Sequence, residues 1–427
     1  MHPMISTTYE QRRGLERMTA DQLAAFQLQR FSGLLAEVLP HNRFYDDKLG
    51  GVALPLESID QLADLPFTTK PELIGEADQL ATNLTFPTEQ YVRFHRTSGT
   101  KGRPLVVLDT AADWQWWIDG WQFVLDAAEV GPEDRALMAF SFGPFIGFWS
   151  ANDALAARGT MVIPAGGLGT SARLELIRGS GATVVLCTPT YALHMAESAA
   201  DNQIDLAKLD VRRIIVAGEP GGSVPAIRER IETAWNAKLI DHSGASEIGP
   251  WGYADPQQRG LYVNESEFIA EFISVETGEP ADEGELSELI LTTLGRAGCP
   301  VIRYRTGDLV RPRFTDEGDC RFVLLEGGVL GRSDDMMIIR GVNIFPSSIE
   351  QILRSFPEVA EYRMIAHRHG EMDALRVEVE DRLDAPGRIT KELELRLGLK
   401  VEVSLAPLGS LPRFEGKGKR FVDERGS

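Results

Sequence analysis

The spacing of apolar residues divides the chain into segments of different character. Within the first 90 residues apolar positions recur three and four apart, which predicts mostly helical structure; the clearest run is Leu23, Phe26, Leu28, Phe31, Leu34, Leu35 and Val38. From residue 91 to about 310, short apolar runs alternate with amphipathic stretches; the runs lie at 182–187, 213–217 and 238–240, and one such stretch at 224–235. This alternation is typical of an α/β domain in which strands lead into helices.

Local signals refine the last of these helices and the rest of the chain. Ser223 is predicted to cap the helix at 224–235, and Pro225 suits its first turn. Between residues 285 and 325 apolar strands follow one another without long helices, which predicts a β-rich subdomain.

After Gly331 the pattern predicts a separate, small α+β unit. It contains a short strand at 336–340, a helix at 346–356 and two strands separated by HRHGEMD. In the second of these strands Leu375, Val377 and Val379 alternate with charged residues. The predicted fold class is therefore α/β, with a large N-terminal α/β domain that includes a β-rich subdomain (1–331) and a small C-terminal α+β domain (332–427).

Composition excludes several classes of protein. The chain has 427 residues, of which 43% are hydrophobic, and a formal net charge of −19. An acidic surface repels phosphates, so we expect neither nucleic acid nor a membrane as partner. The N-terminus lacks the apolar run of a signal peptide, and no stretch of 18 apolar residues occurs. The three cysteines are far apart and odd in number, which does not support a disulfide framework. We therefore expect a cytoplasmic globular protein.

The stretch FHRTSGTKGRPLVV at 94–107 carries the clearest candidate chemistry. Its glycines and hydroxyl residues suit neither a regular helix nor a strand, and their N–H and O–H groups can wrap an oxyanion. The candidate loop residues are Thr97, Ser98, Gly99, Thr100, Lys101 and Gly102. The GxxxxGK[ST] nucleotide-binding motif is absent. On the residues alone, an ordinary solvated turn remains the alternative.

Six spaced motifs together resemble those of the adenylate-forming enzymes, the superfamily of acyl-CoA synthetases, adenylation domains and luciferases. They are RTSGTKGRP (96–104), AGEP (217–220), SGASEIGP (243–250), RYRTGDL (303–309), GRSDDMMIIRGVNIFP (331–346) and LPRFEGKGKR (411–420). The compact length, PFTTK at 66–70 and IIRGVNIFPSSIE resemble the phenylacetate–CoA ligase branch.

The resemblance implies that the motifs bind ATP and Mg²⁺. The loop would hold the phosphates, Glu247 the Mg²⁺, and Ser246 would face the α-phosphate. Asp308 would bind the ribose and Arg332 would also contact the nucleotide. Residues implied to complete the nucleotide site are Gly218, Glu219, Pro220, Ser243 and Gly244. Without the resemblance, Asp308 could as well be an ordinary turn residue, and Glu247 could be a surface carboxylate.

The C-terminal motifs are implied to carry catalysis and movement. Lys417, one of nine lysines, would bridge the substrate carboxylate and the α-phosphate. Asp334 would be the hinge of a mobile small domain, and Gly341 would lie on the face presented to coenzyme A. The acid pocket would lie near Phe142, Phe145 and Ala245. By themselves, a basic tail is usually solvated and an aromatic cluster is usually core.

Two residues depart from the family pattern. Ser243 stands where the family usually has a tyrosine, so the group that stacks on adenine is left open. Lys101 replaces the usual threonine of the phosphate loop and adds a positive charge.

The sequence thus predicts an ATP-dependent ligase that activates an aromatic carboxylic acid as an acyl-adenylate and transfers it to coenzyme A. One alternative passes the acyl group to a carrier-protein thiol or another nucleophile. Another is a nucleotide-binding regulator that has lost catalysis, against which the retention of Glu247, Asp308, Asp334 and Lys417 argues. The acid, the acceptor and a homodimeric state are left open.

Overall fold

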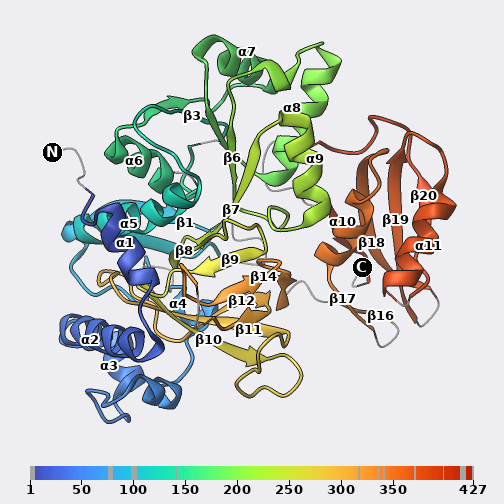
Figure 1. Ribbon diagram of the computed structural model, residues 1–427. Helices are drawn as coiled ribbons and strands as arrows, with labels where there is room; N and C mark the ends of the chain where they lie inside the picture. Colours follow the sequence, from blue (N-terminus) through green and yellow to red (C-terminus); the bar gives the residue numbers. More distant parts are fainter. Residues whose placement is uncertain are drawn as a thin grey trace.

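The computed structural model describes residues 5–75, 80–97, 103–140, 142–147, 149–315, 318–333, 337–339, 342–369, 372–397, 399–413 and 420–425. They form a large domain and, on the right of Figure 1, a small one. The predicted architecture, a large α/β domain followed by a smaller α+β domain, is confirmed. None of the described helices combines the length and the apolar character needed to cross a membrane.

Three helices begin the chain: α1 (Tyr9–Glu16), α2 (Ala20–Val38) and α3 (Arg43–Leu49). Thr8 and Thr19 begin the first two with capping boxes, in which the threonine hydroxyl accepts from the backbone three residues on. The prediction of helix up to residue 90 is wrong beyond α3. The described part of 50–90 holds only short helical turns, namely η1 (Ile59–Asp64), α4 (Lys70–Leu73) and η2 (Thr88–Gln90). Prolines at positions 55, 66, 71 and 87 disfavour longer helices there.

A nine-stranded sheet forms the centre of the large domain, with the strand order β13-β14-β9-β8-β7-β6-β5-β3-β4. Neighbouring strands are parallel from β4 to β7 and antiparallel from β7 to β13. The strands are β3 (Arg135–Met138), β4 (Met161–Pro164), β5 (Val184–Cys187), β6 (Arg213–Val216), β7 (Lys238–Ala245), β8 (Gly249–Ala254), β9 (Gly260–Val263), β13 (Pro312–Arg313) and β14 (Leu324–Glu326).

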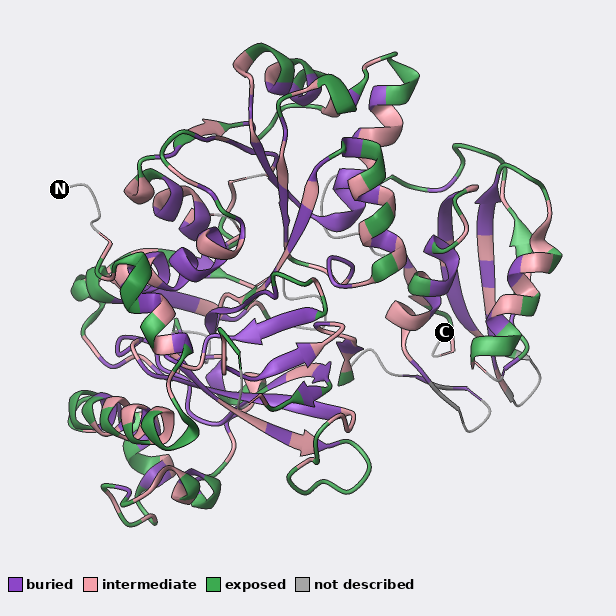
Figure 2. Ribbon diagram, viewed as in Figure 1, coloured by how far each residue is buried: buried purple, intermediate pink, exposed green. Residues whose placement is uncertain are grey.

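Helices cover both faces of the parallel part, whose inner strands β3, β5 and β6 are mostly buried, whereas the edge strand β4 is not (Figure 2). Alternate strand residues point to opposite faces. Ile215 and Ile240 join a core cluster with α5 (Ala111–Ala127) and α6 (Trp149–Arg158). Ile214 and Leu239 join the other cluster, which the remaining helices complete: α7 (Thr170–Ser180), α8 (Pro189–Asp201), η3 (Leu206–Lys208) and α9 (Pro225–Trp235).

The start of α9 differs from the prediction in one respect. Pro225 occupies the first turn as expected, but the N-cap is Val224 and no side chain caps the helix. The Ser223 hydroxyl instead donates to Asp241 Oδ2 at 2.5 Å. A tertiary contact with β7 has therefore replaced the local cap.

The rest of the large domain is antiparallel. A hairpin pairs β1 (Tyr91–Arg96) with β2 (Val106–Thr110). A second sheet has the order β10-β11-β12-β15, with the strands β10 (Phe268–Ser274), β11 (Ser287–Thr293), β12 (Tyr304–Val310) and β15 (Gly331–Arg332). The β-rich subdomain predicted for residues 285–325 corresponds to β11, β12, β13 and β14.

The small domain has its own hydrophobic core, whose members run from Met337 to Phe421. Its elements are β16 (Met337–Ile339), β17 (Val342–Ile344), α10 (Pro346–Arg354), β18 (Val359–His369), β19 (Met372–Asp381), α11 (Pro386–Leu397), β20 (Glu402–Leu405) and β21 (Phe421–Asp423). The predicted alternation in β19 is confirmed, because Leu375, Val377 and Val379 are all buried. β18 and β19 extend further into HRHGEMD than predicted.

The two domains meet where α10 lies beside α9 (Figure 1). The Ser347 hydroxyl donates to the Leu330 carbonyl at 2.6 Å, and Arg230 Nη1 reaches the Arg354 carbonyl at 3.4 Å. A small hollow of about 70 Å³ adjoins the first of these contacts; Pro220 lines it from the large domain and Glu350 from the small one. The segment Gly218-Glu219-Pro220, implied by the resemblance to form part of the nucleotide site, therefore adjoins the domain interface.

Candidate active site

The predicted site residues gather at the carboxyl ends of the parallel strands. The segments that follow β3, β5, β6 and β7 contain Phe142, Thr190, Gly218 and Ser246, respectively. β3 lies between β4 and β5, so the order of the strands reverses at this point. In α/β sheets ligands bind in the crevice at such a reversal, outside the carboxyl ends of the strands. The topology therefore places the candidate motifs where this fold binds ligands.

The segment Gly218-Glu219-Pro220 follows β6 and is held against the start of α8. Gly218 has φ +93°, a conformation that favours glycine. The Glu219 carboxylate accepts hydrogen bonds from the Thr190 backbone N–H at 2.8 Å and from the Thr190 hydroxyl. Burial raises the pKa of Glu219, and the Glu350 carboxylate of the small domain raises it further. The segment is thus fixed on one side and electrostatically coupled to the small domain on the other.

Glu247 lies just beyond the end of β7 and is 8% exposed. Its Oε1 accepts from Lys70 Nζ at 3.1 Å and from the Tyr304 hydroxyl at 3.0 Å. Burial alone would raise the pKa of Glu247, but the Lys70 charge and these hydrogen bonds hold it below its ordinary value. An ionised carboxylate at this edge is the hard oxygen ligand that Mg²⁺ prefers, so the residue fits the predicted metal role.

Lys70 is predicted to control the ionisation of Glu247. In Lys70→Met the pKa of Glu247 should rise, because burial then acts without the opposing charge. The acid limb of the pH profile of adenylate formation should shift to higher pH, since the carboxylate would protonate earlier on acidification. The measurement is the rate of adenylate formation between pH 5 and 8, with Lys48→Met as control, because Lys48 pairs with Glu72 instead. An unchanged acid limb in Lys70→Met would contradict the prediction.

Asp308 and Arg332, two residues predicted to contact the nucleotide, are brought together by the sheet. β12 pairs with β15 so that Asp308 lies opposite Arg332, and Arg332 Nη1 donates to Asp308 Oδ1 at 2.9 Å. Tyr304, four residues earlier on β12, is the residue that reaches Glu247. One strand therefore links the predicted ribose carboxylate to the predicted magnesium carboxylate.

A buried ion pair supports the turn that carries Ser246 and Glu247. Arg296 and Asp109 are both fully buried, and Arg296 Nη2 lies 2.6 Å from Asp109 Oδ1. Arg296 Nη1 donates to the Ser246 carbonyl at 2.9 Å, and Trp117 Nε1 donates to the same Asp109 oxygen. The guanidinium thus connects the core beneath α5 to the backbone of the site.

Sequence reasoning missed four of these supporting residues: Lys70, Tyr304, Asp109 and Arg296. Lys70 and Tyr304 lie inside motifs that indicated the family, PFTTK and RYRTGDL, but the patterns carried no sign that both contact Glu247. The scarcity of lysine was the one available signal for Lys70. Nothing in the spacing indicated the pair formed by Asp109 and Arg296.

In the aromatic segment after β3, Phe142 and Trp149 pack against each other, whereas Phe145 is exposed. Phe142 meets Trp149 edge to face at 4.6 Å, and Trp149 Nε1 donates to the Gly143 carbonyl at 3.0 Å. Phe142 and Ala245 both pack, partly buried, against the core cluster that includes Trp121. Phe145 is 41% exposed. The structure thus brings Phe142 and Ala245 to the same cluster, whereas Phe145 is exposed.

Several predicted residues lie outside the described residues, and their roles stay predictions: Ser98, Gly99, Thr100, Lys101, Gly102, Asp334, Gly341 and Lys417. The base of the predicted phosphate loop is described. The Thr97 N–H donates to the Leu105 carbonyl at 2.9 Å, and the Leu105 N–H donates to the Thr97 hydroxyl at 3.0 Å. The Arg96 N–H donates to the Pro144 carbonyl at 2.7 Å. The loop base is therefore closed and attached to the aromatic segment.

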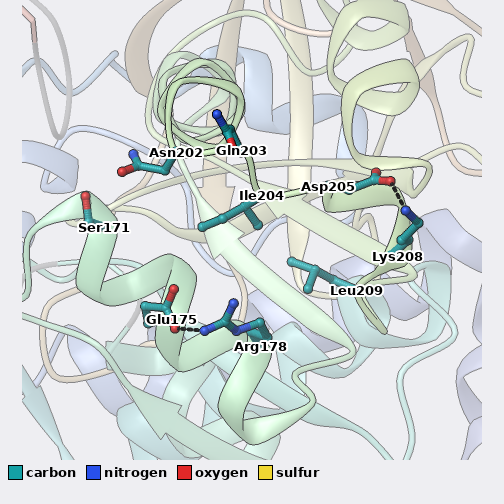
Figure 3. A pocket seen from close by; sticks show the side chains of 9 residues that line it. All are labelled: Ser171, Glu175, Arg178, Asn202, Gln203, Ile204, Asp205, Lys208 and Leu209. Atoms are coloured by element: carbon teal, nitrogen blue, oxygen red, sulfur yellow. Dashed lines mark hydrogen bonds and ion pairs between the residues drawn. The ribbon is translucent and has the colours of Figure 1, made fainter.

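A larger hollow of about 460 Å³ lies away from this site, between α7 and the segment around η3 (Figure 3). Four of its lining side chains pair with each other: Glu175 with Arg178, and Asp205 with Lys208. None of the predicted site residues lines it. The size of a hollow is therefore a poor guide to the site in this chain.

Family models match both domains. One described as an AMP-binding enzyme matches residues 59–267, and one described as an AMP-binding enzyme C-terminal domain matches residues 341–425. The phenylacetate-coenzyme A ligase of Escherichia coli strain K12 is 32% identical, over 96% of this chain and 97% of that protein. The phenylacetate-coenzyme A ligase of Thermus thermophilus is 31% identical, over 96% of this chain and 98% of that protein.

The fold also matches solved structures of 2-hydroxyisobutyryl-CoA ligase. In its postadenylation state with a bound acyl-adenylate, that enzyme superposes with a TM-score of 0.89 at 26% identity, over 97% of this chain and 92% of that one. In its thioesterification state with CoA the TM-score is 0.73, again at 26% identity, over 98% and 94% of the two chains. The arrangement of the two domains here therefore resembles the postadenylation state more closely.

Proposed function

The chain belongs to the AMP-binding enzymes, in their phenylacetate–CoA ligase-like branch, and is an AMP-forming acid–CoA ligase; we propose that the acid it activates is aromatic. Its substrates are a carboxylic acid, ATP and coenzyme A. The observation that supports an aromatic acid is the position of Phe142 and Trp149 after β3 and of Ala245 at the end of β7, all packed against one core cluster. Pockets for small molecules are lined mainly by apolar and aromatic side chains.

In the first half-reaction we propose that the acid carboxylate attacks the α-phosphorus of ATP, whose bond to the leaving pyrophosphate breaks. Two anions meet in this step, so the positive groups of the site lower its barrier. Glu247 would hold Mg²⁺, which when bound neutralises phosphate charge. Lys70 keeps that carboxylate ionised, and Asp308 would accept from the ribose hydroxyls. Ser246, whose carbonyl Arg296 anchors, would face the α-phosphate.

In the second half-reaction the coenzyme A thiol attacks the acyl carbonyl, and AMP leaves. We propose that the small domain, residues 332–427, rotates about Asp334 between the two steps, so that Lys417 is replaced at the site by the face that carries Gly341. The different TM-scores to two states of one relative support two domain arrangements. A carrier-protein acceptor, a homodimeric state and a cytoplasmic location stay predictions.

The nucleotide product tests the reaction, and a panel of acids tests the substrate class. With Mg-ATP, coenzyme A and benzoates, phenylacetates or cinnamates, the protein should release AMP and pyrophosphate in equal amounts. Coupled assays for pyrophosphate, with the nucleotides separated by chromatography, measure this. ADP as the product would contradict the adenylate mechanism. Higher kcat/KM for aliphatic acids of similar length would contradict the aromatic assignment and leave the mechanism standing.

A further inference from the structure

The two faces of β7 separate two compartments at the carboxyl edge of the sheet. On one face Asp241 accepts from Ser223, which follows the Gly218-Glu219-Pro220 segment. On the other face, with Ile240, His242 points toward the core cluster of α5. The proposed nucleotide segment and the proposed acid wall therefore lie on opposite sides of this strand, and His242 is on the side of the acid.

The imidazole of His242 is buried and neutral, with a defined tautomer. Nδ1 lies 2.7 Å from the Gly252 carbonyl, which can only accept, so Nδ1 carries the proton. Burial lowers the pKa of His242 to about 4, against the opposing effect of that hydrogen bond. At neutral pH the other ring nitrogen, Nε2, is therefore an unprotonated hydrogen-bond acceptor.

That acceptor faces accessible space. Among the described residues Nε2 has no hydrogen-bond partner, and it is not sealed from solvent although the residue is only 5% exposed. Gly244, two residues on and exposed, has no side chain to cover Nε2; a Cβ built there would lie 3.4 Å from Nε2 and 2.9 Å from the Gly249 carbonyl, so only glycine fits without a shift of the backbone. The lone pair is thus open to a ligand at the site rather than satisfied within the core.

The surroundings of this acceptor are aromatic. The His242 ring lies 4.3 Å from that of Trp121, whose Nε1 donates to Ser150 at 2.8 Å. Ser150 follows Trp149, which packs against Phe142. In a pocket with apolar walls, a single polar atom orients the ligand and favours ligands that carry a group able to hydrogen-bond to it.

We infer that the acid activated by this enzyme carries a hydroxyl or amino group that donates a hydrogen bond to Nε2 of His242. This inference rests on the proposed function, since it concerns the acid site of the same ligase. An acid that places only C–H groups there would leave the buried acceptor unpaired, and sites built to bind a substrate O–H or N–H discriminate strongly against analogues that lack it.

The experiment compares acids in matched pairs by kcat/KM for AMP formation. Benzoate and phenylacetate are each compared with their ortho, meta and para hydroxy and amino derivatives, and two short aliphatic acids with their 2-hydroxy derivatives. At least one substituted acid should exceed its parent by about ten- to a hundredfold in the wild-type enzyme, as expected for one well-placed hydrogen bond. His242→Leu should abolish this preference, and His242→Gln, which keeps an acceptor oxygen, should retain part of it.

His194→Leu on α8 is the matched control, because His194 lies outside the site and its loss should leave the preference unchanged. The inference is overturned if every parent acid equals or exceeds its substituted derivatives, or if a folded His242→Leu keeps the wild-type preference. If His242→Leu does not fold, the wild-type panel and His242→Gln decide. A preference confined to aliphatic hydroxy acids would refute the aromatic assignment but support the role of His242. The experiment therefore distinguishes failure of the proposed substrate class from failure of the proposed hydrogen bond.

Discussion

Replacing Arg296 by methionine is expected to lower the free energy of unfolding by about 3–5 kcal/mol, the usual cost of removing one partner of a buried ion pair. Asp109 is fully buried; its Oδ1 accepts a hydrogen bond from Arg296 Nε at 2.8 Å, and Arg296 Nη2 lies 2.6 Å from the same oxygen. Without the guanidinium, Trp117 Nε1 at 3.2 Å would be the one donor to that oxygen left among the described residues. Urea denaturation followed by tryptophan fluorescence measures the loss.

Two controls separate the buried pair from a general effect of losing charge. Arg43→Met removes an arginine whose partner Asp47 is 72% exposed, and should change stability by less than about 0.5 kcal/mol. The double variant Asp109→Leu/Arg296→Met should recover much of the loss, because neither charge is then left unpaired. The double variant should still form adenylate slowly, since the Ser246 carbonyl has lost its donor. A loss in Arg296→Met no larger than that in Arg43→Met would contradict the prediction.

The large-scale fold could be predicted from the sequence because the hydrophobic periodicity changes where the architecture changes. Short apolar runs became the parallel strands β5, β6 and β7, and the amphipathic stretch after Ser223 became α9. One error, the missing helix between residues 50 and 90, has a local cause in the prolines there; the other arose where a tertiary contact outweighs local preference. Ser223 has the chemistry of a cap, yet its hydroxyl is bound to Asp241, 18 residues away.

Only those residues of the candidate site that lie in recognisable motifs, and not their supporting partners, could be predicted from the sequence. Asp308 and Glu247 stand in recognisable patterns, whereas Lys70 contacts Glu247 across 177 residues and Arg296 contacts Asp109 across 187. The spacing of residues along the sequence does not predict such pairs, because they form only when strand pairing and loop packing bring distant segments together. His242 shows the same limit: its tautomer depends on Gly252, a partner on the next strand.

Replacing Lys417 by alanine is expected to slow adenylate formation by about a hundredfold or more. Carboxylate and α-phosphate repel each other, and a preorganised ammonium that bridges them is worth a few kcal/mol in the transition state. Both flanks of the segment that carries this lysine are attached to the small domain. Arg413 pairs with the buried Glu380 at 2.7 Å, and Arg420 pairs with the buried Glu361 at 2.7 Å. Lys417 should therefore enter and leave the site with that domain.

The decisive comparison assays the two half-reactions separately in Lys417→Ala and in Lys419→Ala, the neighbouring lysine. If the small domain carries Lys417 away before thiolation, Lys417→Ala should still form thioester from a supplied acyl-adenylate at close to the wild-type rate. Lys419→Ala should be mild in both assays. Thermal unfolding of Lys417→Ala should be nearly unchanged, because the ion pairs of Arg413 and Arg420 remain on either side. Adenylate formation near the wild-type rate in Lys417→Ala would refute the assignment. Equal losses in both half-reactions would place the lysine at the site throughout and argue against the rotation of the small domain.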